Sequence, residues 1–234
     1  MKILQKGFNY SQDGPGNRLV YHLQGCNFKC KWCSNPESMP MKNPKAKDYT
    51  VDEIISEVER SKMMFFDGGG VTFTGGECTL QCDELLETLE KLKEHNISTA
   101  IETNGSNPRL SELAEYVDYL IIDFKHYDPN EHKKWIGMGN GQVLKNLEEL
   151  IESGRELHIR IPLIKHVNDD FIGFCEFFRD KNTENIDVEI LPYHEFGKDK
   201  WTEEYEITDG FVSDETVRAF TRKLNEMGIK TIKT

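Results

Sequence analysis

The sequence predicts an α/β protein with parallel strands, arranged as a partial (βα)6 barrel. Three observations support this class. Short apolar, β-branched runs alternate with amphipathic stretches, there are six such pairs, and reactive or charged side chains gather directly after the strand-like runs. Alternation of this kind predicts a parallel sheet covered by helices. Six units are fewer than the eight that close a complete barrel, so we expect the sheet to stay partly open.

The predicted strands are short runs such as VTFT and YLIID, rich in β-branched and aromatic residues. They cover residues 18–23, 71–74, 98–102, 119–123, 157–162 and 187–191, and a tail at 228–232 could add a further strand. The predicted helices cover residues 50–63, 82–95, 109–116, 142–153, 169–180 and 214–227. In the second helix, four leucines (Leu85, Leu86, Leu89 and Leu92) recur at helical spacing. We expect a single domain over residues 1–234.

Composition limits the classes of function. The chain has 234 residues and a formal net charge of −12, which argues against a nucleic-acid backbone as the main partner. The sequence contains neither an apolar run long enough to span a membrane nor the apolar core of a signal peptide. We therefore expect a cytoplasmic protein with no membrane contact. We also expect it to be a monomer. The chain has six cysteines. In a reducing compartment disulfides are rare, so cysteines that are clustered are better interpreted as metal ligands or catalytic groups.

Three of the cysteines lie close together in the segment GCNFKCKWCSNPE, after the first predicted strand. Cys26, Cys30 and Cys33 have CxxxCxxC spacing. Three thiolates on one loop can hold three irons of a [4Fe–4S] cluster and leave the fourth iron open to another ligand. The alternative is a zinc site completed by His22, in a non-catalytic zinc or electron-carrier module. His22 lies inside the predicted strand, where its side chain is more suited to packing.

Further motifs lie at the ends of the other five predicted strands. TGGEC, ETNG, DFK and LPYHEFGKDKW follow the second, third, fourth and sixth strands, and RIP closes the fifth. In parallel α/β folds, ligands bind at the carboxyl ends of the strands. We therefore expect all six motifs to meet at one rim of the sheet.

The order of these motifs, together with DGPGNR at residues 13–18, resembles that of the radical S-adenosylmethionine (SAM) enzymes. Within them it is similar to the activating enzymes of glycyl radical enzymes, over about residues 13–201. The resemblance implies the radical SAM fold, a TIM-like partial barrel. It also implies one [4Fe–4S] cluster and SAM as cofactors, and oxygen sensitivity. Its implied reaction is reductive cleavage of SAM to a 5′-deoxyadenosyl radical, which abstracts hydrogen from a glycine of a partner enzyme. Flavodoxin or ferredoxin is the implied electron donor.

The resemblance also implies roles for single residues. Cluster ligation falls to Cys26, Cys30 and Cys33. The implied SAM contacts are Trp32, Ser34, Gly75, Gly76, Glu77, Asp123, Lys125, Arg160 and His194. Among these, Glu77 lies at the methionine amino end, where a carboxylate complements an ammonium. Arg160 faces the SAM carboxylate, and His194 faces the ribose or adenine.

Three oxygen-bearing residues, Glu102, Thr103 and Asp123, resemble the ligands of a monovalent cation beside the SAM carboxylate. The family usually has Asp where this chain has Glu102, so the sequence departs from the pattern at this site. The alternative for Asp123 and Lys125 is an ion pair at the end of a strand.

Many relatives carry a cysteine-rich, ferredoxin-like insertion after the cysteine loop. Residues 34–49 of this chain contain no cysteine, so we expect no such insertion and a single cluster. Cys78, Cys82 and Cys175 are interpreted as small hydrophobic residues. A radical SAM enzyme that acts on a small molecule is the alternative function. We expect no added substrate domain, which favours a protein substrate.

Overall fold

The computed structural model describes residues 1–233. The chain divides into two compact units. Unit 1 comprises Met1–Asn27, Asn35–Thr103 and Asn107–Ile121, and unit 2 comprises Phe28–Ser34, Asn104–Ser106 and residues 122–233. The single domain expected from the sequence stays a prediction. Within residues 1–233, no helix is both long enough and apolar enough to cross a membrane.

Unit 1 contains a mixed sheet in which β2, β4 and β5 run parallel. Its strands are β1 (Lys2–Tyr10), β2 (Asn17–Leu23), β3 (Lys47–Asp48), β4 (Val71–Gly75) and β5 (Thr99–Thr103). β1 pairs antiparallel with β2 on one side and with β3 on the other. Leu23 lies opposite Gly75 in the register of β2 and β4. The carboxyl ends of these two strands therefore meet at one edge, as the sequence predicts for this unit.

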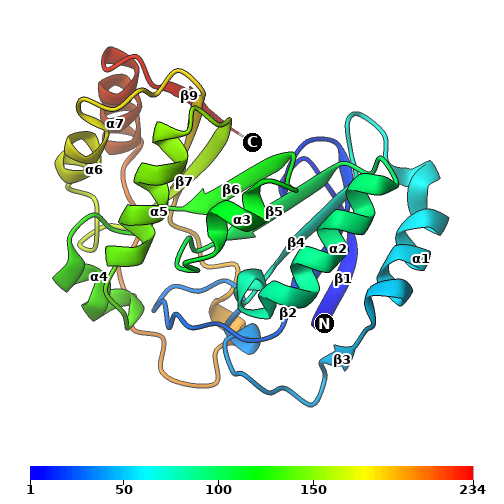
Figure 1. Cartoon of the computed structure of the whole chain (residues 1–234). Coiled ribbons are helices and arrows are strands. Elements are labelled where there is room, and N and C mark those ends of the chain that lie inside the picture. Colours follow the sequence, from blue (N-terminus) through cyan, green and yellow to red (C-terminus); the bar gives the residue numbers. More distant parts are fainter. Residues whose placement is uncertain (234) are drawn as a thin grey trace. The chain divides into compact units, whose positions relative to one another are not determined.

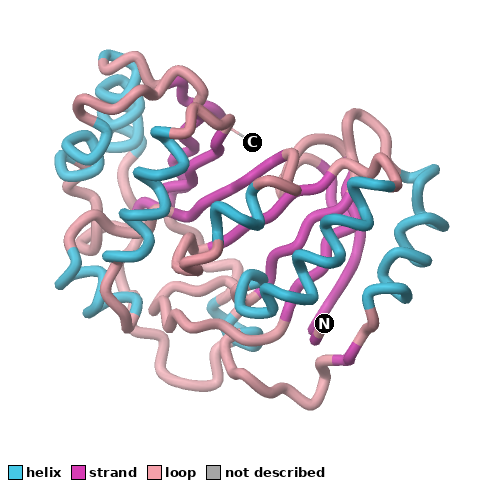
Figure 2. The backbone as a smooth tube through the Cα atoms, viewed as in Figure 1, coloured by secondary structure: helices cyan, strands magenta, loops and turns pink. Residues whose placement is uncertain are grey.

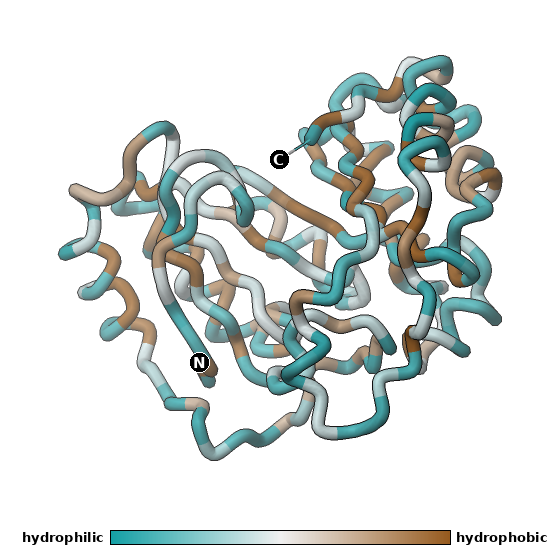
Figure 3. Tube along the Cα trace, turned by 180° about the vertical axis from the view of Figure 1, so that it is seen from behind, coloured by the Kyte–Doolittle hydropathy of each residue, from teal (hydrophilic) through white to brown (hydrophobic). Residues whose placement is uncertain are grey.

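Three helices accompany this sheet: α1 (Val51–Ser61), α2 (Cys82–Glu94) and α3 (Leu110–Ala114). Single 3-10 turns lie at η1 (Pro36–Ser38), η2 (Lys62–Met64) and η3 (Cys78–Gln81). α1 begins after Thr50, which forms a capping box with Glu53. Hydrophobic and hydrophilic residues alternate along α1 (Figure 3), and its buried residues are Ile54, Ile55 and Val58. α1 packs beside α2 (Figure 1).

The starts of the parallel strands in unit 1 are tied together by Arg18, the arginine of the DGPGNR motif. Its side chain is fully buried. The guanidinium donates hydrogen bonds to Thr72 Oγ1 and to the carbonyls of Val71 and Ser98, at 2.8, 2.8 and 3.1 Å. Burial lowers the pKa of Arg18 to about 10, so the group remains charged at neutral pH. Arg18 thus has a structural role at the amino ends of β2, β4 and β5.

Unit 2 contains the parallel strands β7 (Leu157–Leu163), β8 (Ile186–Pro192) and β9 (Lys230–Ile232). Residues of β6 (Tyr119–Asp123) belong to both units. The helices of unit 2 are α4 (Pro129–Ile136), α5 (Gly141–Glu152), α6 (Ile172–Phe178) and α7 (Asp214–Glu226). Between β8 and α7 the chain is mostly loop (Figure 2), interrupted by the single turn η4 (Lys198–Lys200).

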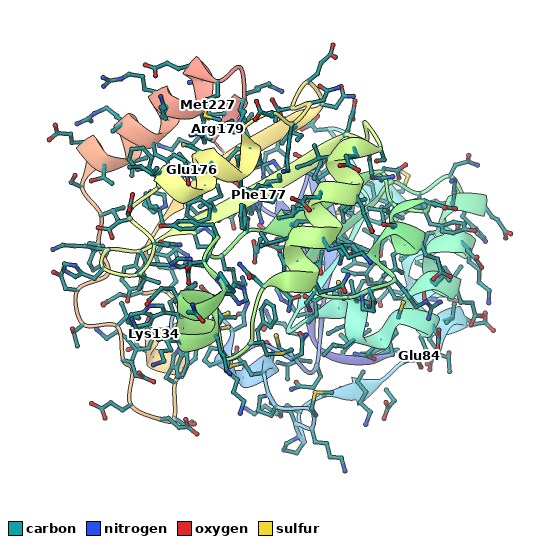
Figure 4. The ribbon with its side chains drawn as sticks, turned by 60° about the vertical axis from the view of Figure 1, so that its left-hand side comes forward. Glu84, Lys134, Glu176, Phe177, Arg179 and Met227 are labelled. Carbon is teal, nitrogen blue, oxygen red and sulfur yellow. The ribbon has the colours of Figure 1, made fainter. Side chains whose placement is uncertain are left out.

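Aromatic rings form much of the interior of unit 2. The ring of Phe124 meets Phe174 and Phe177 edge to face, with centroids 5.0 and 4.8 Å apart. Phe177 and Glu176 lie on α6, and Arg179 directly follows that helix (Figure 4). Glu176 and Arg179 form an exposed ion pair of 3.7 Å. The residue after β6 is therefore anchored in the core while the polar side of α6 stays in solvent.

The α/β class with parallel strands is confirmed, and all six predicted strands and six predicted helices are present, with shifted ends. The tail strand is confirmed as β9. Within residues 1–233, two strands and one α-helix were not predicted: β1, β3 and α4. The signals for α4 are readable in retrospect, because Asp128 caps its start, Pro129 occupies its first turn and Gly137 ends it in the left-handed conformation.

Candidate functional site

The segment that carries Cys30 and Cys33 is held inside unit 2 by the end of α4. The backbone N–H of Lys29 donates to Ile136 O at 2.8 Å, and that of Lys31 donates to Trp135 O at 3.1 Å. Within the segment, the Cys33 N–H donates to Cys30 O at 3.1 Å. Two parallel attachments fix the backbone on both sides of Cys30, so α4, which was not predicted, positions this part of the site.

The segment after β8 supports the same loop, a role that sequence reasoning missed. Trp201 Nε1 donates to Cys33 O at 3.0 Å, and Lys200 Nζ donates to Ser34 O at 2.9 Å. A Cβ on Gly197 would lie 2.4 Å from the Cα of Ser34, so only glycine allows this approach. The available signal was the unusual GKDKW motif, whose glycine, lysine and tryptophan each contact the Cys33–Ser34 backbone.

Trp32 anchors the cysteine loop by packing. Its ring lies against a hydrophobic cluster of Ile164, Val167, Tyr193 and Ile207. The side chain of Trp32 is therefore engaged in the interior of unit 2. Its implied contact with SAM would therefore have to use the backbone of Trp32.

In unit 1, the turn after β4 lies directly against the turn that leads into Cys26. The N–H of Gly76 donates to Leu23 O at 2.9 Å, and the N–H of Glu77 donates to Gly25 O at 2.8 Å. A Cβ on Gly76 would come within 2.2 Å of Gly25 O. The second glycine of the GGE motif thus permits the turn after β4 to lie against Gly25, the residue before Cys26.

Glu77 itself is buried, with 1% of its surface exposed. Its Oε1 accepts hydrogen bonds from the backbone and hydroxyl of Thr79, at 3.1 and 2.5 Å, and from the hydroxyl of Thr103, at 2.6 Å. Several donors hold the carboxylate in one orientation, which is suitable for an ammonium ligand.

The residues predicted to bind a monovalent cation have protein partners as well. Thr103 donates to Glu77, as described, and Thr74 Oγ1 donates to Glu102 Oε2 at 2.9 Å. In unit 2, Lys125 Nζ and Asp123 Oδ2 form an ion pair of 2.7 Å. The ion pair considered as the alternative for Asp123 and Lys125 is thus present. The cation site stays a prediction.

Lys125 is also the positive charge that accompanies the two cysteines of unit 2. Burial by itself would lower the pKa of Lys125. The negative charges of the Asp123 carboxylate and of the Cys30 and Cys33 thiolates outweigh this and raise the pKa of Lys125 above its ordinary value. The ammonium therefore stays charged, and it favours the thiolate form that binds iron.

Arg160 and His194 lie on neighbouring parts of unit 2. Arg160 is within β7 rather than at its end, and its Nε donates to Glu189 Oε2 at 2.9 Å. His194 follows β8, and its ring stacks on Phe196 with centroids 4.4 Å apart. Burial lowers the pKa of His194, so the ring is neutral at pH 7. A neutral imidazole can donate to or accept from a ribose hydroxyl.

The other three cysteines have environments that favour the protonated thiol. Cys78 and Cys175 are buried, and Cys82 is partly exposed. Burial raises the pKa of all three, and for Cys78 the carboxylates of Glu77 and Glu102 add to the effect. Their interpretation as small packing residues fits these surroundings.

The donor set fits a [4Fe–4S] cluster. No cysteine in the described chain forms a disulfide, so Cys26, Cys30 and Cys33 retain their thiols. Within residues 1–233, no three His, Cys, Asp or Glu side chains are arranged around a single metal ion. Cluster ligands differ from such a group, because each cysteine binds a different iron of the cube.

Comparison with known proteins gives the same class. The family model of the radical SAM superfamily matches residues 20–178. A pyruvate formate-lyase-activating enzyme from Streptococcus mutans is 34% identical over 205 residues, covering 82% of this chain and 77% of that protein. A 4-hydroxyphenylacetate decarboxylase activating enzyme from Clostridioides difficile is 32% identical over 266 aligned positions, covering 84% of each chain. The solved domain of a pyruvate-formate lyase-activating enzyme from Bacteroides vulgatus has a TM-score of 0.60 and 28% identity, and covers 70% of this chain and 98% of that one.

The chain belongs to the radical SAM superfamily, whose members use a [4Fe–4S] cluster and SAM. Its relatives there are activating enzymes of glycyl radical enzymes. The expected likeness to the activating enzymes of glycyl radical enzymes is thereby confirmed.

Proposed function

We propose that this chain activates a partner glycyl radical enzyme by removing a hydrogen atom from one backbone glycine. The observation that carries the proposal is the supported CxxxCxxC loop in a chain that matches two kinds of activating enzyme over most of its length. When bound, the reduced cluster supplies the electron that splits SAM into methionine and the 5′-deoxyadenosyl radical.

Cys26, Cys30 and Cys33 would hold the cluster. Lys125, a half-buried cation of unit 2, would offset the negative charge that three thiolates bring. Glu77 would receive the amino group of SAM, Arg160 its carboxylate and His194 its ribose or adenine. Gly75 and Gly76 would bring backbone close to the methionine end, and the backbone of Trp32 and Ser34 would lie along the adenine.

Hydrogen transfer needs neither an acid nor a base. The Cα–H bond breaks evenly, the hydrogen atom joins C5′ to give 5′-deoxyadenosine, and the unpaired electron remains on the glycine. That glycyl radical is stabilised because it is delocalised into the two flanking amides. The protein's contribution is to hold the reacting atoms close together and to exclude water.

The proposal includes a one-electron donor of the flavodoxin or ferredoxin type, because each cleavage of SAM consumes one electron. It also includes a cytoplasmic location and a monomeric state. A reducing compartment suits an enzyme that depends on free thiolates and a reduced cluster. The carboxylates of Glu102 and Asp123, with Thr103, would bind a monovalent cation beside SAM.

A deuterium experiment tests the substrate class. Reduced, reconstituted protein is incubated with SAM and with pyruvate formate-lyase or 4-hydroxyphenylacetate decarboxylase, the enzymes for which its relatives are named. The partner enzyme carries α-deuterated glycine. We expect deuterium in 5′-deoxyadenosine and a glycyl radical signal in electron paramagnetic resonance with one of these partners, and slow SAM cleavage without a partner.

The alternative function gives a different result. If deuterium enters 5′-deoxyadenosine from a free metabolite and no protein radical forms, the chain is a radical SAM enzyme with a small-molecule substrate. Protein that binds iron but does not cleave SAM would contradict both functions.

A further inference from the structure

Arg160 and Glu189 face each other across the parallel strands β7 and β8. They are direct partners in the register, so their side chains project from the same face of the sheet. Both residues are buried: 6% of Arg160 and 1% of Glu189 remain exposed. His158, two residues earlier on β7, is buried beside them.

A single carboxylate oxygen joins the three side chains. Oε2 of Glu189 accepts from Arg160 Nε at 2.9 Å and lies 3.2 Å from His158 Nε2. The backbone of Arg160 is fixed as well, because Phe124 N–H donates to its carbonyl at 2.7 Å. A buried carboxylate and a buried guanidinium each cost much free energy when alone, so each keeps the other in place.

We propose that Glu189 is a positioning residue that aims the guanidinium of Arg160 at the carboxylate of SAM. The guanidinium is planar and rigid, so a contact at Nε fixes the plane and the directions of both Nη groups. An arginine held in this way loses less conformational freedom when it binds a carboxylate. This inference rests on the proposed function, because it takes Arg160 as the residue that meets SAM.

β8 also supplies a matched control. Asp187 lies two residues before Glu189 on the same strand, and its carboxylate pairs with Lys230 Nζ at 2.8 Å near the surface. Asp187→Asn removes one negative charge from the same strand without touching Arg160. Comparing this variant with Glu189→Gln therefore distinguishes the effect of losing the Arg160 contact on SAM binding from the effect of losing one negative charge.

The experiment measures binding of two ligands to the reconstituted holoenzyme by calorimetry. The ligands are SAM and decarboxylated SAM, which has the amino group and the sulfonium but lacks the carboxylate. In Glu189→Gln we expect SAM to bind about tenfold more weakly and decarboxylated SAM to bind as in the wild type. Asp187→Asn should bind both ligands as the wild type does. Arg160→Met should likewise bind SAM more weakly without a change in its affinity for decarboxylated SAM. The double variant, Glu189→Gln with Arg160→Met, should bind SAM no more weakly than Arg160→Met alone.

Equal weakening for both ligands in Glu189→Gln would overturn the proposal, since it would show a general structural role. Unchanged SAM binding in Glu189→Gln, with weakened binding in Arg160→Met, would also overturn it while leaving the proposed function intact. A wild-type holoenzyme that binds neither ligand would contradict the proposed function itself. If Glu189→Gln does not fold, Glu189→Asp replaces it; this variant keeps the charge, shortens the reach to Nε, and should show the same selective loss.

Discussion

Thr103 donates a hydrogen bond of 2.6 Å to Oε1 of Glu77, joining the last residue of β5 to the turn after β4. Both residues are buried, with 2% and 1% of their surfaces exposed. The sequence suggested Thr103 as a cation ligand and Glu77 as a SAM contact. The structure links the two, so that the hydroxyl helps to orient the carboxylate.

The Thr103–Glu77 contact gives the first prediction. Thr103→Val keeps the shape of the side chain and removes the hydroxyl, so one donor to the buried carboxylate is lost. We expect the free energy of unfolding to fall by about 1 kcal/mol. We also expect SAM to bind several-fold more weakly, because Glu77 is less well oriented toward its amino group. Urea denaturation and calorimetry provide the two measurements, and Thr103→Ser, which retains the hydroxyl, is the control. SAM binding that is equal in Thr103→Val and Thr103→Ser would contradict this link.

The second prediction concerns the cluster. Anaerobically reconstituted protein should contain about four irons per chain, and Cys30→Ala should lose them. Cys78→Ala and Cys82→Ala should keep them, because burial holds these thiols in the protonated form. Iron analysis and the visible absorption spectrum provide the measurement. A stable form with eight irons, or loss of iron in the Cys82 variant, would show that the ligand set is wrong.

The third prediction concerns the monovalent cation. If Glu102 and Asp123 bind one beside SAM, the rate of SAM cleavage should depend on which alkali ion is present at constant ionic strength. The reason is that oxygen ligands at fixed positions accept one ionic radius better than another. Glu102→Gln should weaken this dependence. Equal rates in sodium, potassium and tetramethylammonium would mean that Glu102 and Asp123 serve protein contacts, such as those with Thr74 and Lys125, and bind no cation.

The fourth prediction is a loss of stability in mild acid that involves His126. This side chain is buried, its Nδ1 accepts from the Asp128 N–H at 2.9 Å, and its Nε2 donates to Val167 O at 3.0 Å. Burial lowers the pKa of His126 below its usual 6.5. His126 therefore binds a proton more readily in the unfolded chain than in the folded one. Its contribution to the free energy of unfolding is complete above pH 6.5 and is lost as the pH falls toward the folded-state pKa of His126.

Urea denaturation at pH 7.5, 6.0 and 5.0 measures this effect. The free energy of unfolding should decrease as the pH is lowered. This decrease should be shallower in His126→Asn, because the asparagine side-chain oxygen can still accept from the Asp128 N–H but the side chain does not titrate. An identical slope in the variant and the wild type would assign the acid sensitivity to other groups.

Local sequence patterns predicted most of the elements because their signals are local. The strand 119–123 was placed correctly, since a continuous apolar, β-branched run between polar residues fits a buried parallel strand. The helix α1 was recognised from its spacing of apolar residues. β1 was missed because its residues are mostly exposed and its pairing with β2 and β3 is antiparallel, outside the repeating pattern.

The candidate site also has features that the sequence predicts and contacts that only the structure shows. CxxxCxxC spacing, the GGE motif and the strand-end residues were readable from the sequence because metal ligation and close backbone approach require particular residue types at short spacing. The partners of these residues were not readable. Glu189 lies 29 residues from Arg160, and Trp201 lies 168 residues from Cys33, so only folding brings each pair together.

The sequence by itself therefore determined the α/β class and the radical SAM family, and it named the candidate side chains of the site. Only the tertiary structure decided how those side chains are held: Glu77 by Thr103, Arg160 by Glu189, and the Cys33 backbone by Trp201. The physical reason is that secondary structure and ligand type depend on neighbouring residues. The orientation of a buried charged group instead depends on whichever distant donor or acceptor the packed fold places against it.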